Sequence, residues 1–309
     1  MEHYLRYTIL FISVLKITSL PTQNGCAPLE VQENRDNVSI EVPFPSVFNN
    51  IAPMLRILQS PQYITHVGAK EILKVFQIAK EKKREFEAAG GKKNYPLIVL
   101  EGLAGSGKST LVRGLAKKIN GLQSHSPSSS AQKLRRLFLN DTVMDNLYHY
   151  FSHYITGLEV SLWLKDSPVI LDRFWHSSST YSIARAAYNT QATYTLPPRG
   201  DKIYNWPDDL LKPDAVLFLD VDETSRVQRI NLRLQDNLKK GSEKEELILG
   251  KNELLLQICP DYRNNIILAY KNMDRPAVTF LNASLSVEDV LDEAYSKVKP
   301  LLGSSYQVS

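Results

Sequence analysis

Residues Gly102 to Ser109 read GLAGSGKS and match the pattern G-x-x-x-x-G-K-[ST] of a phosphate-binding loop. In such a loop, successive backbone N–H groups point inward around a phosphate, and the following helix presents its positive end to the same anion. We expect the Lys108 ammonium to reach the β and γ phosphates of a nucleotide, and the Ser109 hydroxyl to bind Mg²⁺. The predicted phosphate-binding residues are Gly102, Leu103, Ala104, Gly105, Ser106, Gly107, Lys108, Ser109 and Thr110.

A second charged pair ends another apolar run, SPVILDRF, at residues 167–174. Ligand-binding residues gather at the carboxyl ends of strands in an open α/β sheet. Asp172 would therefore share the Mg²⁺ shell with Ser109. Arg173 would set its fixed fork of donors against phosphate oxygens, a geometry that suits a phosphoryl group better than lysine does.

Four short apolar runs predict the strands that position these residues: YPLIVLEG (95–102), SPVILDR (167–173), DAVLFLDVD (214–222) and PAVTFLNAS (276–284). Runs that are apolar on both faces indicate strands buried between helices in a parallel sheet. The crossover helices are expected at 109–119, 141–163 and 177–188, and a weaker strand signal lies at 120–123. The sequence thus predicts a doubly wound α/β domain of about five strands over residues 93–302.

The first ninety residues lack this rhythm. Residues 1–27 contain a short apolar run, YTILFISVL, which suits a secretory signal, a mitochondrial presequence or a disordered leader. Nine residues are too few for a membrane span, because about 20 are needed. Residues 28–92 are expected to form an irregular extension with one amphipathic helix near 68–87, and residues 303–309 a tail.

The charge and hydropathy of the sequence indicate which classes of partner are expected. A net charge of +4 over 309 residues suits anionic ligands but is too dispersed for a nucleic-acid binder, so we expect no nucleic-acid partner. No other segment is apolar for long enough to cross a bilayer, so no membrane span is expected in the mature protein.

Five stretches together resemble the thymidylate kinase family, most closely its mitochondrial UMP/CMP kinase 2 branch, over about residues 93–302: LEGLAGSGKST, PVILDRFWHSSSTYSIA, LPPRG, YNWPDDLLKPDAVLFLDVD and SRVQRINLR. The resemblance implies a P-loop NTPase-type sheet with a mobile lid. It also implies a kinase that moves the γ-phosphoryl of ATP, with Mg²⁺, onto a pyrimidine nucleoside monophosphate such as UMP, CMP, dUMP, dCMP or dTMP. The location it implies is mitochondrial, with the cytoplasm as the alternative, and a homodimer stays open.

The resemblance also assigns roles by matching position. Asp172 and Arg173 would bridge the metal and both phosphates, and Ser177 and Tyr181 would contact the acceptor nucleotide. Arg226, Arg229 and Arg233 would begin the lid, with Arg229 and Arg233 as catalytic residues beside Lys108, Asp172 and Arg173. Arg199, in the loop LPPRGDK, is a further candidate for the acceptor phosphate.

Two departures from the family pattern keep alternatives open. Ala104 stands where the family's loop usually carries an acidic residue near the acceptor sugar. The predicted helix 141–163 offers Asp145, Asn146, Tyr148 and His149 where the family tends to place arginine. A deoxynucleoside kinase is one alternative, although those enzymes carry Glu-Arg in place of Asp172-Arg173. A nucleotide-binding sensor or scaffold is the other, although such a protein needs no acceptor bridge.

Overall fold

A computed structural model describes residues 44–139, 141–190, 195–239 and 251–303, and the predicted leader lies outside these ranges. Its centre is a five-stranded parallel sheet in the order β2-β3-β1-β4-β5. The strands are β1 (Leu97–Gly102), β2 (Leu122–His125), β3 (Val169–Asp172), β4 (Ala215–Asp220) and β5 (Val278–Asn282). The predicted α/β class and strand number are confirmed.

The register brings the two predicted charged motifs side by side. Leu100 of β1 pairs with Asp172 of β3 on one side and with Leu217 of β4 on the other. Every residue of β1 is buried, as its apolar run predicts, whereas β2 at the sheet edge is mostly exposed. The weak strand signal at 120–123 therefore corresponds to β2, which begins two residues later.

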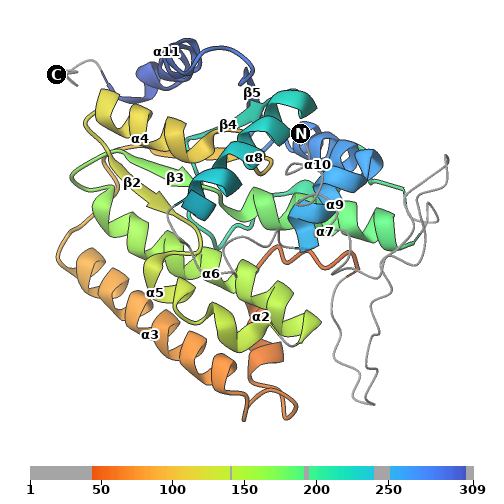
Figure 1. Cartoon of the computed structure of the whole chain (residues 1–309). Helices are drawn as coiled ribbons and strands as arrows, with labels where there is room; N and C mark the ends of the chain where they lie inside the picture. Colours follow the sequence, from red (N-terminus) through yellow and green to blue (C-terminus); the bar gives the residue numbers. More distant parts are fainter. Residues whose placement is uncertain (1–43, 140, 191–194, 240–250, 304–309) are drawn as a thin grey trace.

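Helices cover both faces of the sheet (Figure 1). One face is covered by α4 (Lys108–Lys118) and α11 (Val287–Val298), whose apolar side chains share a core with β1, β4 and β5. The opposite face is covered by α6 (Thr142–Trp163), α7 (Trp175–Asn189) and α10 (Pro260–Asn272). Alternating strands and helices of this kind form the three layers expected from the sequence.

A further helical layer lies outside α6 (Figure 1). It consists of α2 (Ile51–Leu58) and α3 (Val67–Ala88), which bury apolar side chains in the core of α6. The sequence predicted one helix in an otherwise irregular extension, and the structure adds α2. The Asn50 side chain caps α2 by accepting a hydrogen bond from the Ala52 amide, and Met54, Ile57 and Leu58 are buried, so a short capped helix is stabilised by packing.

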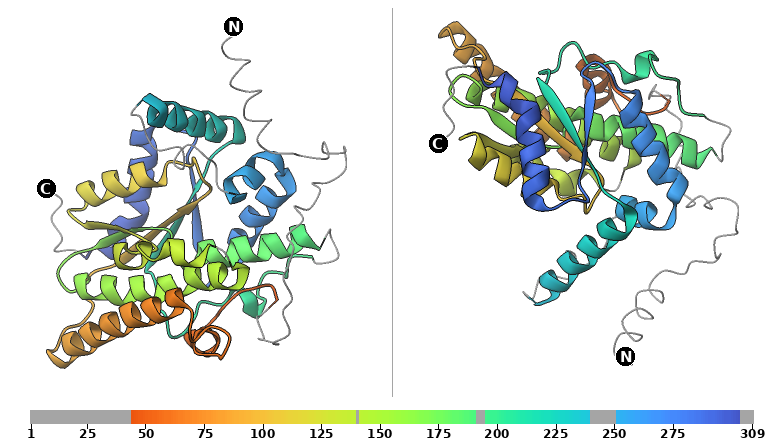
Figure 2. Two further views of the ribbon diagram at one scale, coloured as in Figure 1. Left: turned by 60° about the horizontal axis from the view of Figure 1, so that its bottom comes forward. Right: turned by 90° about the horizontal axis from the view of Figure 1, so that it is seen from above.

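The remaining elements are short or lie at the rim. They are α5 (Ser129–Gln132), α8 (Glu223–Lys239), α9 (Lys251–Ile258) and the 3₁₀ turns η1 (Arg135–Phe138), η2 (Lys202–Tyr204) and η4 (Lys299–Leu301). In both views of Figure 2, α8 lies at the margin of the molecule with much of its length away from the sheet. Within the described ranges, no helix is long and apolar enough to cross a membrane.

Candidate active site

The predicted phosphate loop connects β1 to α4, as its sequence context requires. Gly107 caps α4 with a left-handed φ of 97°, which lets the chain turn into the helix without a side-chain clash. Gly105 has a φ of 85°, and a Cβ there would lie 2.8 Å from the backbone oxygen of Arg226. The loop is thus packed tightly against α8, and its glycines permit both the turn and the close approach.

Lys108 is buried and turned toward its own loop. Its Nζ donates hydrogen bonds to the backbone oxygens of Gly102 at 3.0 Å and Leu103 at 2.9 Å. Burial, followed by the positive charge of Arg173, lowers the pKa of Lys108 to about 7, while Asp172 and Glu101 oppose the shift. A phosphate at the loop would supply the negative charge that favours the protonated ammonium.

Ser109 and Asp172 lie together, as predicted for a shared metal shell. The Ser109 hydroxyl donates to Oδ2 of Asp172 over 2.8 Å, joining the first turn of α4 to the end of β3. Ser109 is exposed and Asp172 half-buried, so both oxygens are reachable from solvent. One hydroxyl and one carboxylate suit Mg²⁺, which prefers oxygen ligands and fills its other positions with water and substrate phosphates.

Arg173 adopts a strained backbone conformation beside this pair. Its φ of 65° is left-handed, which costs a non-glycine residue roughly 1–2 kcal/mol. The Arg173 amide donates to the backbone oxygen of Leu100 at 2.9 Å, and the guanidinium donates to the Ser177 hydroxyl at 2.9 Å. The guanidinium also lies 5.9 Å from the ring centre of Tyr181, so the structure brings Arg173, Ser177 and Tyr181 together as the sequence predicted.

Glu101 is a charged site residue that the sequence reasoning missed. It is fully buried near the end of β1, and its carboxylate accepts hydrogen bonds from the Phe174 amide, the Ser177 hydroxyl and the Tyr270 hydroxyl. Burial raises the pKa of Glu101, whereas the charge of Arg173 and the three donors lower it. The available signal was an acidic residue inside an otherwise apolar strand run.

The three predicted lid arginines have different environments. Arg226 is completely buried: it pairs with Glu223 and donates to the backbone oxygens of Ala104 and Leu256. Arg226 thus connects the phosphate loop to α9, and its part in a lid stays a prediction. Arg229 donates to the backbone oxygens of Ser106 and Ala283, while Arg233 is half exposed and pairs with Glu253 at 3.1 Å.

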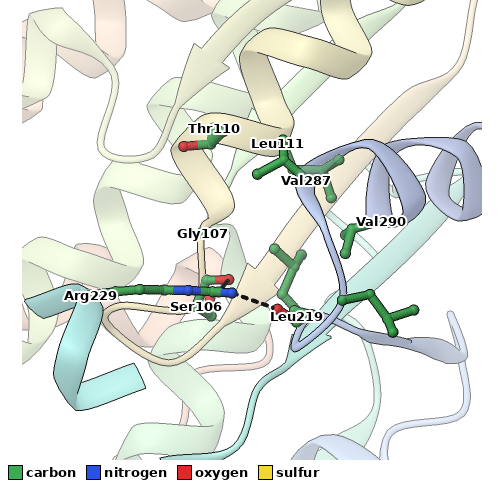
Figure 3. A pocket seen from close by; sticks show the side chains of 10 residues that line it. Ser106, Gly107, Thr110, Leu111, Leu219, Arg229, Val287 and Val290 are labelled. Atoms are coloured by element: carbon green, nitrogen blue, oxygen red, sulfur yellow. Dashed lines mark hydrogen bonds between the residues drawn. The ribbon is translucent and has the colours of Figure 1, made fainter. Parts of the chain in front are cut away.

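A pocket lies on the α11 side of the phosphate loop (Figure 3). It encloses about 510 Å³ of empty space, its open mouth included. The guanidinium of Arg229 forms one wall and is held by its hydrogen bonds to the backbone oxygens of Ser106 and Ala283. Apolar side chains of α4, β4 and α11 form the other walls. The lining residues are Ser106, Gly107, Thr110, Leu111, Leu219, Arg229, Ala283, Leu285, Val287 and Val290.

Of the residues named in the two departures, Ala104 lies in the phosphate loop and the others lie on α6. Asp145 pairs with Arg135, and the Asn146 side chain donates to the backbone oxygen of Ser46 at 3.2 Å. Burial, followed by the charge of Arg135, lowers the pKa of His149 to about 4. Arg199 is largely exposed and lies 3.8 Å from the Asp274 carboxylate, so its contact with an acceptor stays a prediction.

The sequence profile described as thymidylate kinase matches residues 100–293, well over half of the chain. The chain belongs to the thymidylate kinase family. The matched range begins inside β1 and ends within α11, so it contains the phosphate loop, the Asp172-Arg173 pair and all three arginines of α8.

Among members of this family, the human protein "UMP-CMP kinase 2, mitochondrial" is 31% identical over 209 residues, which are 67% of this chain and 43% of that protein. The chain thus spans less than half the length of this relative. A probable thymidylate kinase of Methanocaldococcus jannaschii is 30% identical over 177 residues, covering 55% of this chain and 85% of that protein.

Solved structures of similar proteins include a thymidylate kinase from Candida albicans, with 17% identity and a TM-score of 0.45, covering 67% of this chain and 92% of that one. A deoxyadenosine kinase from M. mycoides with dCMP and dCDP bound has 19% identity and a TM-score of 0.45, covering 66% of this chain and 99% of that one.

Proposed function

We propose that the chain is a nucleoside monophosphate kinase that transfers the γ-phosphoryl of ATP to a pyrimidine nucleoside monophosphate. The observation that carries this proposal is the placement of Asp172 and Arg173 between two groups of residues. Asp172 contacts Ser109 of the phosphate-loop helix, and Arg173 contacts Ser177 of α7. A protein that only held ATP would have no use for a guanidinium placed between the phosphate loop and the polar side chains of α7.

The donor nucleotide is assigned to the phosphate loop and the adjoining pocket. The triphosphate would lie over the loop amides, and the adenine would enter the pocket between Arg229 and the apolar side chains of α11. A guanidinium stacks well on a planar ring, and the two backbone oxygens already hold that of Arg229 in place.

The acceptor is assigned to the α7 side of Arg173. Ser177 and Tyr181 lie on the first turns of α7, one helical turn apart, and both contact Arg173. The guanidinium would hold the acceptor's phosphate, and Tyr181 would lie beside its sugar or base. A pyrimidine is proposed because the human relative is named a UMP-CMP kinase, and its name also supports a mitochondrial location.

These residues can promote transfer by position and charge alone. Phosphoryl transfer requires the attacking and leaving oxygens in line and the developing charge neutralised, with little covalent chemistry. Lys108 and Arg173 bring positive charge from the donor and acceptor sides, and Asp172 with Ser109 would hold Mg²⁺, which would supply further positive charge at the phosphates. Arg229 and Arg233, on α8, are proposed to close over ATP and exclude water.

The test is product formation by the full chain with ATP·Mg²⁺ and a panel of UMP, CMP, dUMP, dCMP, dTMP and the corresponding nucleosides. Lys108→Ala serves as the blank. We expect one or more monophosphates to yield the diphosphate, and the variant to yield none. Phosphorylated nucleosides instead would identify a deoxynucleoside kinase, and ATP binding without any product would leave a nucleotide sensor.

A further inference from the structure

The buried carboxylate of Glu101 connects β1 to α7, to the turn before α7 and to α10. Glu101 lies on β1. Phe174 lies in the turn between β3 and α7, Ser177 lies in the first turn of α7, and Tyr270 lies on α10. Its Oε1 accepts from the Phe174 amide at 2.9 Å. Its Oε2 accepts from the Ser177 hydroxyl at 2.5 Å and from the Tyr270 hydroxyl at 2.8 Å.

Ser177 connects this carboxylate to Arg173. A serine hydroxyl has one proton, and here Glu101 accepts it. The Ser177 oxygen also accepts a hydrogen bond from the guanidinium of Arg173 over 2.9 Å. Arg173 thus donates to Ser177, and Ser177 donates to Glu101. Each bond in such a chain strengthens the next in a buried setting.

Arg173 needs an external restraint. Its backbone is left-handed, a conformation that persists in a non-glycine residue only where the surroundings impose it. Glu101 supplies restraint on both sides of the strained residue, because it holds the following amide, that of Phe174, directly and the Arg173 side chain through Ser177. Burial raises the pKa of Glu101, and the Arg173 guanidinium and the three donors oppose that shift and favour the ionised carboxylate.

We propose that Glu101 is a positioning residue, whose carboxylate fixes the Arg173 guanidinium through Ser177 in the place where the acceptor's phosphate binds. This inference rests on the proposed function, because it assumes that Arg173 faces the acceptor. Tyr270 supports the same carboxylate from α10, so a residue remote from the phosphate loop in sequence takes part in holding the acceptor side.

The test uses the full chain and four forms: unsubstituted, Glu101→Gln, Arg173→Ala and the double variant. Glutamine keeps the volume of Glu101 and its hydrogen-bonding reach but removes the charge. Calorimetric titration with the preferred pyrimidine monophosphate and, separately, with ATP·Mg²⁺ gives both affinities, and thermal unfolding shows whether each form is folded. The double-mutant cycle isolates the coupling between the two residues.

We expect Glu101→Gln to weaken monophosphate binding about tenfold while ATP binding changes by less than about threefold, since only charge-assisted bonds on the acceptor side are lost. In the Arg173→Ala background the same change should have little further effect. Equal losses for both ligands, or additive losses in the double variant, would overturn the proposal in favour of a structural role.

If Glu101→Gln does not fold, Tyr270→Phe takes its place, because it removes one donor from Oε2 and leaves the charge and the substrate-side groups intact. A loss confined to the monophosphate supports the proposal, and an equal loss for ATP overturns it. If the unsubstituted chain binds no pyrimidine monophosphate, the proposed function fails as well, whereas additive losses overturn the positioning role alone.

Discussion

The hydroxyl of Ser109 and the carboxylate of Asp172 lie 2.8 Å apart, although 62 residues separate them in the chain. The contact exists because β1 and β3 are neighbours and in register, so that the phosphate loop and the Asp172-Arg173 turn emerge at the same sheet edge. The pair offers two oxygen ligands for a hard cation where the β and γ phosphates of ATP are expected.

Asp172→Asn should therefore lower kcat by about 10²–10³-fold, because a neutral amide no longer attracts the cation that neutralises the transferring phosphoryl group. The Mg²⁺ concentration needed for half-maximal rate should rise in the same variant. Steady-state kinetics across a Mg²⁺ series measures both. Asp220→Asn, at the exposed end of β4 on the other side of β1, is the control and should behave as the unsubstituted chain does.

Gly105→Ala should abolish ATP binding and destabilise the fold. An added Cβ would lie 2.8 Å from the backbone oxygen of Arg226 and 2.9 Å from a side-chain carbon of Ile230. Gly200→Ala is a matched control: its φ of 91° imposes similar backbone strain, but nothing lies within 4 Å of the added carbon. Calorimetric unfolding and ATP titration should show a larger loss at Gly105, and equal losses would mean that strain alone explains both.

Substitution of Arg226 should lower the free energy of unfolding more than substitution of Arg233 does. Arg226 is buried and pairs with Glu223, so Arg226→Met would remove the donor to the backbone oxygen of Ala104 and leave Glu223 paired with Arg263 alone, at a cost of about 1–3 kcal/mol. Arg233→Met removes a half-exposed pair worth less than about 1 kcal/mol. Urea denaturation compares the two, and similar costs would show that the burial of Arg226 has no energetic consequence.

Arg229→Ala should raise the KM for ATP about tenfold and leave the KM for the acceptor within about twofold, because the variant removes one wall of the donor pocket only. Arg113→Ala, on the exposed side of α4, provides the control for loss of a nearby positive charge. If the KM for the acceptor rose by the same factor, Arg229 would not act specifically in ATP binding.

Acidification should destabilise the protein through two histidines whose pKa values are lowered in the folded state. Burial lowers the pKa of His176 to about 3 and, with the charge of Arg135, that of His149 to about 4. Below the ordinary value of about 6.5 the unfolded chain binds protons that the folded chain excludes. As the pH is lowered from about 6.5 to about 4, the free energy of unfolding should therefore fall, by up to about 1.4 kcal/mol per pH unit for each histidine.

Urea denaturation at about pH 7 and about pH 5 measures this dependence for the unsubstituted chain, His176→Phe and His125→Gln. The phenylalanine variant should show a smaller fall, because one excluded proton is gone. His125 lies on the exposed strand β2, and its variant should retain the full fall. A pH dependence unaltered in His176→Phe would assign acid sensitivity to other groups.

Much of the fold follows from local patterns. The apolar runs that became β1, β3, β4 and β5, and the glycine-rich loop between β1 and α4, carry their signals within ten residues each. The proximity of Ser109 and Asp172 also follows, because parallel strands bring their carboxyl ends to one edge.

Other features depend on contacts between distant residues. Tyr270 meets Glu101 across 169 residues, and no spacing in the sequence relates them. The arginines of α8 repeat at helical intervals, which is equally consistent with a solvent-exposed face and with a buried one. Only the packing of α8 against the phosphate loop and α9 distinguishes Arg226 from Arg233.

The segment before the first strand contributes to the interior of the protein. Trp175 of α7 donates its ring N–H to the backbone oxygen of Phe48, and the Phe48 ring packs edge-on against Tyr150 of α6. The family match begins only at Leu100. A gene fragment cut at the border of homology would expose the apolar sides of α6 and α7 that α2, α3 and Phe48 now cover. The part of the chain that is similar to the family is therefore shorter than the part that packs as one folded unit.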